Sequence, residues 1–121
     1  MARVILERKF VPQGTKIIKQ GEDAYSAYLI QSGRVRVYKK RGEEELELAT
    51  LEVGDICGEM ALIDDNNIRS ASVEAIEDCN VIVITKAVFE DKLKNSDRTI
   101  QAIIKMLIKR MIESNEKRSQ I

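Results

Sequence analysis

One stretch of the sequence combines a glycine, an acid and a base at a spacing that suits a sugar phosphate. Gly58 opens the short apolar run 58–63, and a glycine there lets the backbone N–H groups of a helical turn approach an anion closely. Arg69 follows the polar linker 64–68, and a guanidinium can donate two hydrogen bonds to two phosphate oxygens. A carboxylate would repel phosphate, so Glu59 is better suited to accept hydrogen bonds from sugar hydroxyls.

Each of these side chains also has a simpler structural interpretation. Arg69 could be an ordinary surface residue of a strand, and Glu59 could serve the N-terminus of a helix. Arg69 nevertheless stands between a polar loop and the run Ser-Ala-Ser-Val, with an acid upstream at a matching distance. The combination therefore favours the sugar-phosphate site over the surface interpretation.

The composition narrows the classes of function. The 121 residues include 20 basic and 20 acidic side chains, so no net charge favours nucleic acid or an anionic membrane surface as a partner. Histidine is absent, which removes the usual zinc and iron ligand sets and the histidine base of a nucleophilic triad. We therefore expect no metal, no catalytic residues and no enzymatic activity.

The cysteines and the apolar runs indicate the cellular compartment. Cys57 and Cys79 stand in apolar surroundings without CxxC spacing, so we expect reduced core residues rather than a disulfide. The N-terminal apolar run is too short for a signal peptide, and no stretch approaches the about 18 apolar residues of a membrane span. These features predict a cytoplasmic protein.

Short apolar segments separated by glycine-containing turns predict a mainly β fold. The expected extended segments are 4–11, 15–19, 27–30, 34–38, 46–51, 71–75 and 79–84. Many short strands at this spacing argue for an antiparallel sandwich or barrel rather than a parallel sheet. We expect one domain over residues 1–121, with its β part at about 4–85.

Alternation within the strands predicts which side chains face the core. Val35 and Val37 should point inward from the strand 34–38, with the two arginines beside them in water. The apolar side should continue through Leu46, Leu48 and Leu51. Between these segments the charge changes sign about Gly42, which predicts a hairpin tip whose two arms carry complementary charge.

After residue 84 the apolar period changes from two to that of a helix. Thr85 can cap a helix at about 86–94, and Ser96 or Asp97 can cap a longer one at about 97–118. Candidate core contacts of the first helix are Ala87, Phe89 and Leu93, and the apolar stripe of the second is Ile100, Ile104, Leu107 and Met111. The next position of that stripe is Ser114, where the simplest expectation is that the helix leaves the core.

Together these segments resemble the cyclic-nucleotide-binding domains of catabolite activators, protein-kinase regulatory subunits and gated channels. Runs 58–63 and 69–73 resemble the phosphate-binding cassette, and 10–14, 21–22 and 28–35 resemble the early strands and turns. The resemblance implies an antiparallel double-stranded β-helix, or jelly roll, with a short cassette helix and two C-terminal α-helices. One departure is Cys57, where the family commonly has a bulkier residue.

The resemblance also implies roles for particular residues. Glu59 matches the acid that holds the ribose 2′-hydroxyl, and Arg69 matches the base on the cyclic phosphate. Positions that shape the cassette or offer backbone N–H groups are Gly58, Met60, Ala61, Ser70 and Ala71. Ser70 also bears on the choice between cAMP and cGMP, and Ser114 matches a hydroxyl residue that touches the base.

The resulting hypothesis is a cAMP or cGMP sensor that couples occupancy to movement of its C-terminal helix. The nucleotide is a ligand, and no cofactor is expected. The implied partners are a second copy through that helix and an effector domain or protein, with neither nucleic acid nor membrane bound by this domain. The alternative is a degenerate domain that binds no nucleotide and serves as a dimerisation or docking module.

Overall fold

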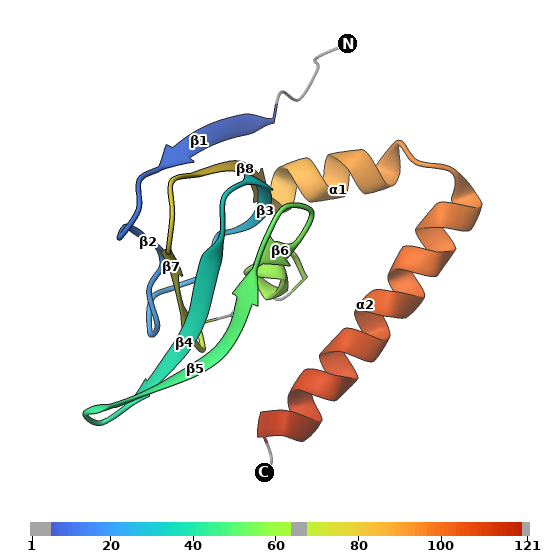
Figure 1. Ribbon diagram of the computed structural model, residues 1–121. Coiled ribbons are helices and arrows are strands. Elements are labelled where there is room, and N and C mark those ends of the chain that lie inside the picture. The colour runs from blue at the N-terminus through green and yellow to red at the C-terminus, as the bar shows by residue number, and fades with distance from the viewer. Residues whose placement is uncertain (1–5, 64–67, 120–121) are drawn as a thin grey trace. The chain divides into compact units, whose positions relative to one another are not determined.

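The computed structural model describes residues 6–63 and 68–119 (Figure 1). The chain forms two compact units, Met1–Val88 and Phe89–Ile121, the first of which holds all the strands. That the two units act as the single domain expected from the sequence stays a prediction. Val4 and Ile5 of the expected first segment lie outside the described residues.

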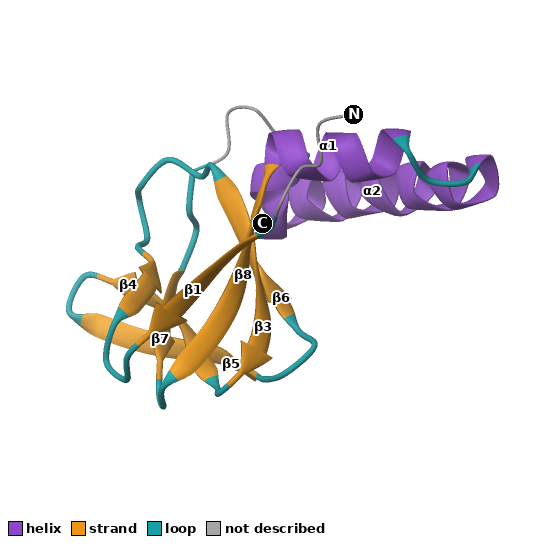
Figure 2. Cartoon of the chain, turned by 90° about the horizontal axis from the view of Figure 1, so that it is seen from above, coloured by secondary structure: helices purple, strands orange, loops and turns teal. Residues whose placement is uncertain are grey.

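The first unit contains two antiparallel four-stranded sheets, seen from a second direction in Figure 2. One sheet has the order β1 (Glu7–Val11), β8 (Cys79–Thr85), β3 (Ser26–Ser32) and β6 (Ile56–Cys57). The other has the order β2 (Lys16–Ile18), β7 (Ser72–Ala75), β4 (Val35–Arg41) and β5 (Glu44–Leu51). A short 3₁₀ helix, η1 (Glu59–Leu62), follows β6. The predicted fold class, with its short cassette helix and two C-terminal helices, is confirmed.

Both sheets contribute to one core, because apolar residues alternate along their strands. The buried cluster is Val11, Ile18, Ile30, Val35, Cys57, Val73, Ala75, Cys79 and Val81, with Ile17, Tyr28, Val37 and Leu51 packed against it. Both cysteines are free and buried, as expected from their apolar surroundings. The inward positions predicted for Val35 and Val37 are therefore confirmed.

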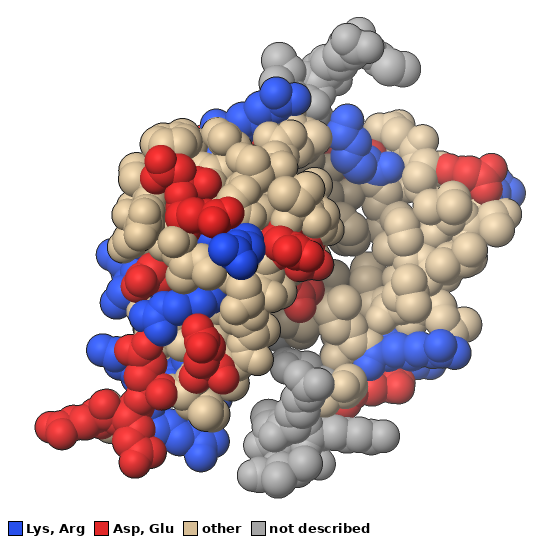
Figure 3. All heavy atoms as spheres, viewed as in Figure 1, with Lys and Arg blue, Asp and Glu red and all other residues tan. Residues whose placement is uncertain are grey.

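The β4–β5 hairpin turns at Gly42, whose φ of +62° lies in the left-handed region. Lys40 stands opposite Glu45, and Arg41 stands opposite Glu44. Figure 3 shows the resulting mixture of acidic and basic side chains at the hairpin end, on the lower left. The predicted complementary charge across the hairpin is confirmed.

The sequence was misleading about Arg36, which we expected in water. A register shift between Val37 and Tyr38 brings Tyr38 inward, so its ring is buried. The Arg36 guanidinium lies 4.1 Å from the centre of that ring and pairs with Glu45 and, at 3.7 Å, with Glu74. Arg36 is therefore neutralised by two carboxylates rather than freely solvated.

The expectation for Leu46 and Leu48 is wrong, because both side chains are exposed, whereas Leu51 packs against the core. β7 pairs with β4 only as far as Tyr38, which faces Glu47 of β5. The outer part of the hairpin, which includes Leu46, therefore extends past β7, and Leu48 is the extra residue at the register shift.

The helices begin where the capping residues predict. The Val88 N–H donates to Thr85 Oγ1 at 3.2 Å at the start of α1 (Lys86–Lys94), and the Thr99 N–H donates to Asp97 Oδ1 at 2.8 Å at the start of α2 (Arg98–Ser119). Ser96 instead donates to the Leu93 carbonyl at 2.6 Å and closes α1.

The predicted core contacts of α1 are only partly confirmed. Ala87 is exposed, which contradicts the prediction, whereas Phe89 and Leu93 are half-buried. On α2 the stripe residues Ile100, Leu107 and Met111 are exposed and Ile104 is half-buried. α1 follows β8 without an intervening loop, and Ala87 lies on its first turn.

Candidate functional site

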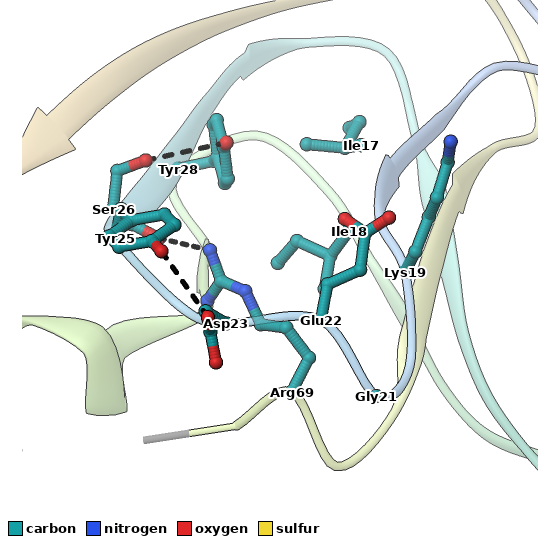
Figure 4. A pocket seen from close by; sticks show the side chains of 10 residues that line it. All are labelled: Ile17, Ile18, Lys19, Gly21, Glu22, Asp23, Tyr25, Ser26, Tyr28 and Arg69. Atoms are coloured by element: carbon teal, nitrogen blue, oxygen red, sulfur yellow. Dashed lines mark hydrogen bonds between the residues drawn. The ribbon is translucent and has the colours of Figure 1, made fainter. Parts of the chain in front are cut away.

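Arg69 is the most deeply buried charged residue of the predicted cassette, with 9% of its surface exposed. Its Nη2 donates to the Ser26 carbonyl oxygen at 2.6 Å, and its Nη1 donates to the Gly58 carbonyl oxygen at 3.4 Å. Figure 4 shows the guanidinium turned toward Ser26 from the opposite side of the site. Both of these acceptors are neutral, so the hydrogen bonds orient the guanidinium without cancelling its charge.

The backbone of Arg69 is fixed by the turn between β2 and β3. The Arg69 N–H donates to the Glu22 carbonyl at 2.8 Å, and the Arg69 carbonyl accepts from the Gly21 N–H at 2.8 Å. Beside them, Asp23 and Ile68 form an isolated antiparallel bridge. The turn thus holds Arg69 much as a neighbouring strand would, which reduces the entropy lost when the side chain binds a ligand.

Glycine is the residue type that fits best at position 58, between Arg69 and the core. Its φ is +73°, and a Cβ at this position would lie 2.5 Å from Arg69 Nη1 and 3.0 Å from Ile18 Cδ1. A side chain there would be strained in its backbone and would collide with the guanidinium. The glycine thus allows the backbone to approach Arg69 closely, and the approach to an anion expected from the sequence stays a prediction.

The short helix η1 carries the other predicted cassette residues. Its first residue, Glu59, is half-buried together with Met60, whereas Ala61 is buried. The Ala61 N–H donates to the Gly58 carbonyl at 3.1 Å. That N–H therefore closes the turn in this structure rather than pointing to a free space.

The pKa of the Cys57 thiol depends on its burial and on the charges around the cassette. Burial raises the pKa of the Cys57 thiol to about 12, with Glu59 raising it further and Arg69 lowering it. The Sγ–H group donates to the Tyr28 carbonyl at 3.7 Å. The charges of Glu59 and Arg69 therefore act on the pKa of the same buried thiol in opposite directions.

The other predicted site residues are Ser70, Ala71 and Ser114. Ser70 is exposed and Ala71 is half-buried, and both lie between Arg69 and the start of β7. Ser114 is exposed on α2 in the second unit, where its contact with a ligand stays a prediction. The linker residues 64–67 lie outside the described residues.

Sequence reasoning missed the residues that hold Arg69, namely Gly21, Glu22 and Ser26. All of them act through backbone atoms, so their side-chain types do not reveal this role. The one sequence signal for them was the turn expected at 20–23.

The turn at 20–23 also borders a cavity of about 510 Å³. The cavity is lined by Ile17, Ile18, Lys19, Gly21, Glu22, Asp23, Tyr25, Ser26, Tyr28 and Arg69, all drawn in Figure 4. Because neither Gly58 nor Glu59 lines this cavity, we place the site by the contacts of Arg69.

The described residues were compared with the requirements of a metal site and of a membrane-spanning helix. Over 6–63 and 68–119 there is no group of three or more acidic or cysteine side chains that could bind a metal ion. Within the same part of the chain, no helix has the length and apolarity needed to cross a membrane.

Comparison with known proteins gives relatives over most of the chain. The cyclic AMP receptor protein of Thermus thermophilus is 30% identical over 116 residues, which cover 95% of this chain and 53% of that protein. The cGMP-dependent protein kinase, isozyme 1, of Drosophila melanogaster is 44% identical over 75 residues, which cover 60% of this chain and 10% of the kinase. The chain thus spans about half of the first relative and a small part of the second.

Three solved forms of one enzyme are similar to this chain in both structure and sequence. The half-site-occupied form of the EAL enzyme Bd1971 matches with a TM-score of 0.84 and 35% identity, over 92% of this chain and 99% of that one. Its cAMP-bound form gives 0.70 at 34% identity, over 91% of this chain and 30% of that one, and its cGMP-bound form gives 0.72 at 33% identity, over 92% and 30%. Residues 8–96 also match the family model of the cyclic nucleotide-binding domain. On this evidence the chain belongs to the cyclic nucleotide-binding domain family.

Proposed function

We propose that this chain is a regulatory domain that binds cAMP or cGMP at the cassette formed by residues 58–61 and 69–71. The observation that carries the proposal is the burial of the Arg69 guanidinium and the identity of its hydrogen-bond partners. Its guanidinium is buried against two carbonyl oxygens, and none of the described carboxylates forms an ion pair with it. A buried cation that has no carboxylate partner among residues 6–63 and 68–119 favours an anionic ligand, because the ligand would supply an opposite charge there.

The role of each residue follows from its chemistry. Arg69 would hold the cyclic phosphate with charge-assisted hydrogen bonds, while Glu59 would accept hydrogen bonds from the ribose. Ser70 and Ala71 would add backbone N–H donors, and Gly58, Met60 and Ala61 would shape the floor beside them. Ser114 would reach the base if α2 closes over the ligand.

The output of binding would be a change in the helical unit. A ligand shifts a conformational equilibrium only by its differential affinity for the two states, so the proposal requires α2 to contact the nucleotide in one of them. The two solved forms of Bd1971 named for cAMP and for cGMP support either nucleotide as the ligand. Because this chain spans only part of its relatives, we propose that an effector domain or protein receives the signal.

Calorimetry with cAMP and with cGMP tests the proposal. Arg69→Ala should weaken binding at least about 100-fold, because it removes two charge-assisted hydrogen bonds of about 1.5 to 3 kcal/mol each. Arg36→Ala is the matched control, because Arg36 is a second partly buried arginine of the same unit and already has carboxylate partners. Equal affinities for wild type and Arg69→Ala, or no binding by wild type, would overturn the proposal.

A second candidate function is self-association through α2. The exposed stripe residues Ile100, Leu107 and Met111 favour it, since such apolar rows on helices commonly pair with a second copy. Light scattering with and without nucleotide separates the candidates. A dimer that forms without any nucleotide binding would favour the docking module over the sensor.

A further inference from the structure

The pairing between β4 and β7 ends at Ser72, next to the proposed binding residues 69–71. The last pair in the register is Tyr38 opposite Ser72. Continued by two residues in the same antiparallel register, β7 would place Ser70 opposite Lys40. In the structure β7 begins only at Ser72, and Ser70 and Ala71 lie outside the strand.

The place opposite Lys40 is filled by a side chain instead. Gln20 Nε2 donates to the Lys40 carbonyl at 3.1 Å, and Gln20 Oε1 accepts from the Lys40 N–H at 2.8 Å. These are the two hydrogen bonds that a strand residue exchanges with a directly opposite partner. The carboxamide of Gln20 therefore acts as a substitute for a backbone peptide group at this point of the sheet.

The backbone of the same turn holds the segment that β7 would otherwise continue. The Gln20 N–H donates to Ser72 Oγ at 3.0 Å, and the Gly21 N–H donates to the Arg69 carbonyl at 2.8 Å. Ser72 is buried, so its hydroxyl is held in a fixed place. The turn thus contacts both ends of the segment 69–72, while the backbone N–H groups of Ser70 and Ala71 donate to no other described residue.

We propose that Gln20 is a positioning residue for the anion site, because its carboxamide ends the β4–β7 ladder and leaves the Ser70 N–H group for a ligand. This inference rests on the proposed function and deepens it by assigning how the donor beside Arg69 is kept free. Without the carboxamide, Lys40 would have an open donor and acceptor, and Ser70 is the nearest residue in register to satisfy them.

The experiment measures nucleotide affinity and amide hydrogen exchange on the full chain. Gln20→Ala should weaken binding of the preferred nucleotide, cAMP or cGMP, about ten-fold by calorimetry. Gln20→Glu should give a smaller loss, because a carboxylate can accept from the Lys40 N–H but cannot donate to its carbonyl. Gln13→Ala is the control, since Gln13 is exposed and its hydrogen bond to Asp78 comes from its backbone N–H.

Hydrogen exchange followed by NMR separates positioning from a general loss of stability. In nucleotide-free wild type, the Ser70 and Ala71 amides should exchange rapidly, and they should become protected when nucleotide binds. In nucleotide-free Gln20→Ala, the Ser70 amide should become protected as β7 extends. Unchanged exchange at Ser70 would overturn the inference even if affinity fell, and unchanged affinity with altered exchange would overturn it as well.

The proposed function and this inference fail in different ways. If wild type binds neither nucleotide, the proposed function fails, while the exchange of Ser70 in nucleotide-free Gln20→Ala still decides whether Gln20 ends the ladder. If wild type binds and Arg69→Ala does not, but Gln20→Ala behaves as wild type in both measurements, only the inference about Gln20 fails.

Discussion

Arg69 and Arg36 lie in the same β unit and differ in what surrounds them. Arg69 is buried against two carbonyl oxygens. Arg36 lies over the ring of Tyr38 and contacts Glu45 and Glu74. Both guanidinium groups are held in place, but among the carboxylates that the structure describes, only Arg36 has ion-pair partners. The lesson is that anion binding depends on the charge of an arginine's partners more than on its burial.

The pKa of Arg36 reflects its carboxylate partners. The hydrogen bond to Glu45 raises the pKa of Arg36 above its usual value, with the charges of Glu45 and Glu74 acting in the same direction. An incoming anion would have to displace these carboxylates. At Arg69 the described partners of the guanidinium are carbonyl oxygens, which is why we assign the site there.

The largest effect should follow from Gly58→Ala, which places a methyl group against the guanidinium of Arg69. A non-glycine residue in the left-handed region costs about 1 to 3 kcal/mol, and the collision adds to that cost. We expect a loss of about 2 to 4 kcal/mol in the free energy of unfolding by urea denaturation, with nucleotide binding reduced more than about ten-fold.

The control for that variant comes from the region of Arg36. Gly42, at the tip of the β4–β5 hairpin, also has a positive φ, but a Cβ there would meet no atom within 4 Å. Gly42→Ala should therefore lose only the backbone contribution and leave nucleotide affinity unchanged. Equal losses of affinity in the two variants would contradict the close approach of Gly58 to Arg69.

Arg36→Ala should affect stability and spare binding. Removing the guanidinium eliminates two ion pairs and the contact with the Tyr38 ring, which together contribute about 1 to 2 kcal/mol at a partly exposed site. We expect that decrease in thermal or urea unfolding, with nucleotide affinity within about two-fold of wild type. A large loss of affinity would show that the two arginine regions are not independent.

The thiol beside the cassette should make stability depend on pH. Because the folded pKa of Cys57 is raised to about 12 from 9.0, the folded protein keeps a proton that the unfolded chain loses. Stability should therefore be constant with respect to this group below pH 9.0 and fall as the pH rises toward 12. At pH 10 the loss should be about 1 kcal/mol, and Cys57→Ala, compared by urea unfolding, should lack this contribution.

The smallest effect should come from a third arginine, Arg34. It pairs with Glu77 at 3.4 Å, and both side chains are about half exposed. Such pairs contribute at most about 0.5 kcal/mol, so Arg34→Ala should change the unfolding free energy within that limit and leave binding intact. A change as large as that of Arg36→Ala would mean that the partly buried carboxylates around Arg36 add little.

The sequence predicted those features that depend on local chemistry. The sign change about Gly42 predicted the hairpin, and Thr85 and Asp97 predicted the starts of two helices. Each of these signals involves residues within a few positions of one another. For the same reason the cassette could be identified before its surroundings were known.

Features set by contacts distant in the sequence were not predicted. The burial of Tyr38 follows from a register shift against β5, and strand alternation alone would not show it. The partner of Arg69 is a backbone carbonyl 43 residues away, and any residue type at position 26 could supply one. Gln20 has the same property, since its carboxamide contacts the backbone of Lys40 rather than a recognisable side chain.

The exposed strand β5 affects how copies of the protein meet in solution. It is an edge strand with its outer backbone groups unpaired by the other strands of its sheet, and it carries the exposed leucines Leu46 and Leu48. Such an edge invites pairing with another chain. The acidic residues Glu44, Glu45 and Glu47 interrupt it, so two copies aligned edge to edge would bring like charges together. In a chain whose net charge is zero, this local repulsion opposes pairing between copies through β5.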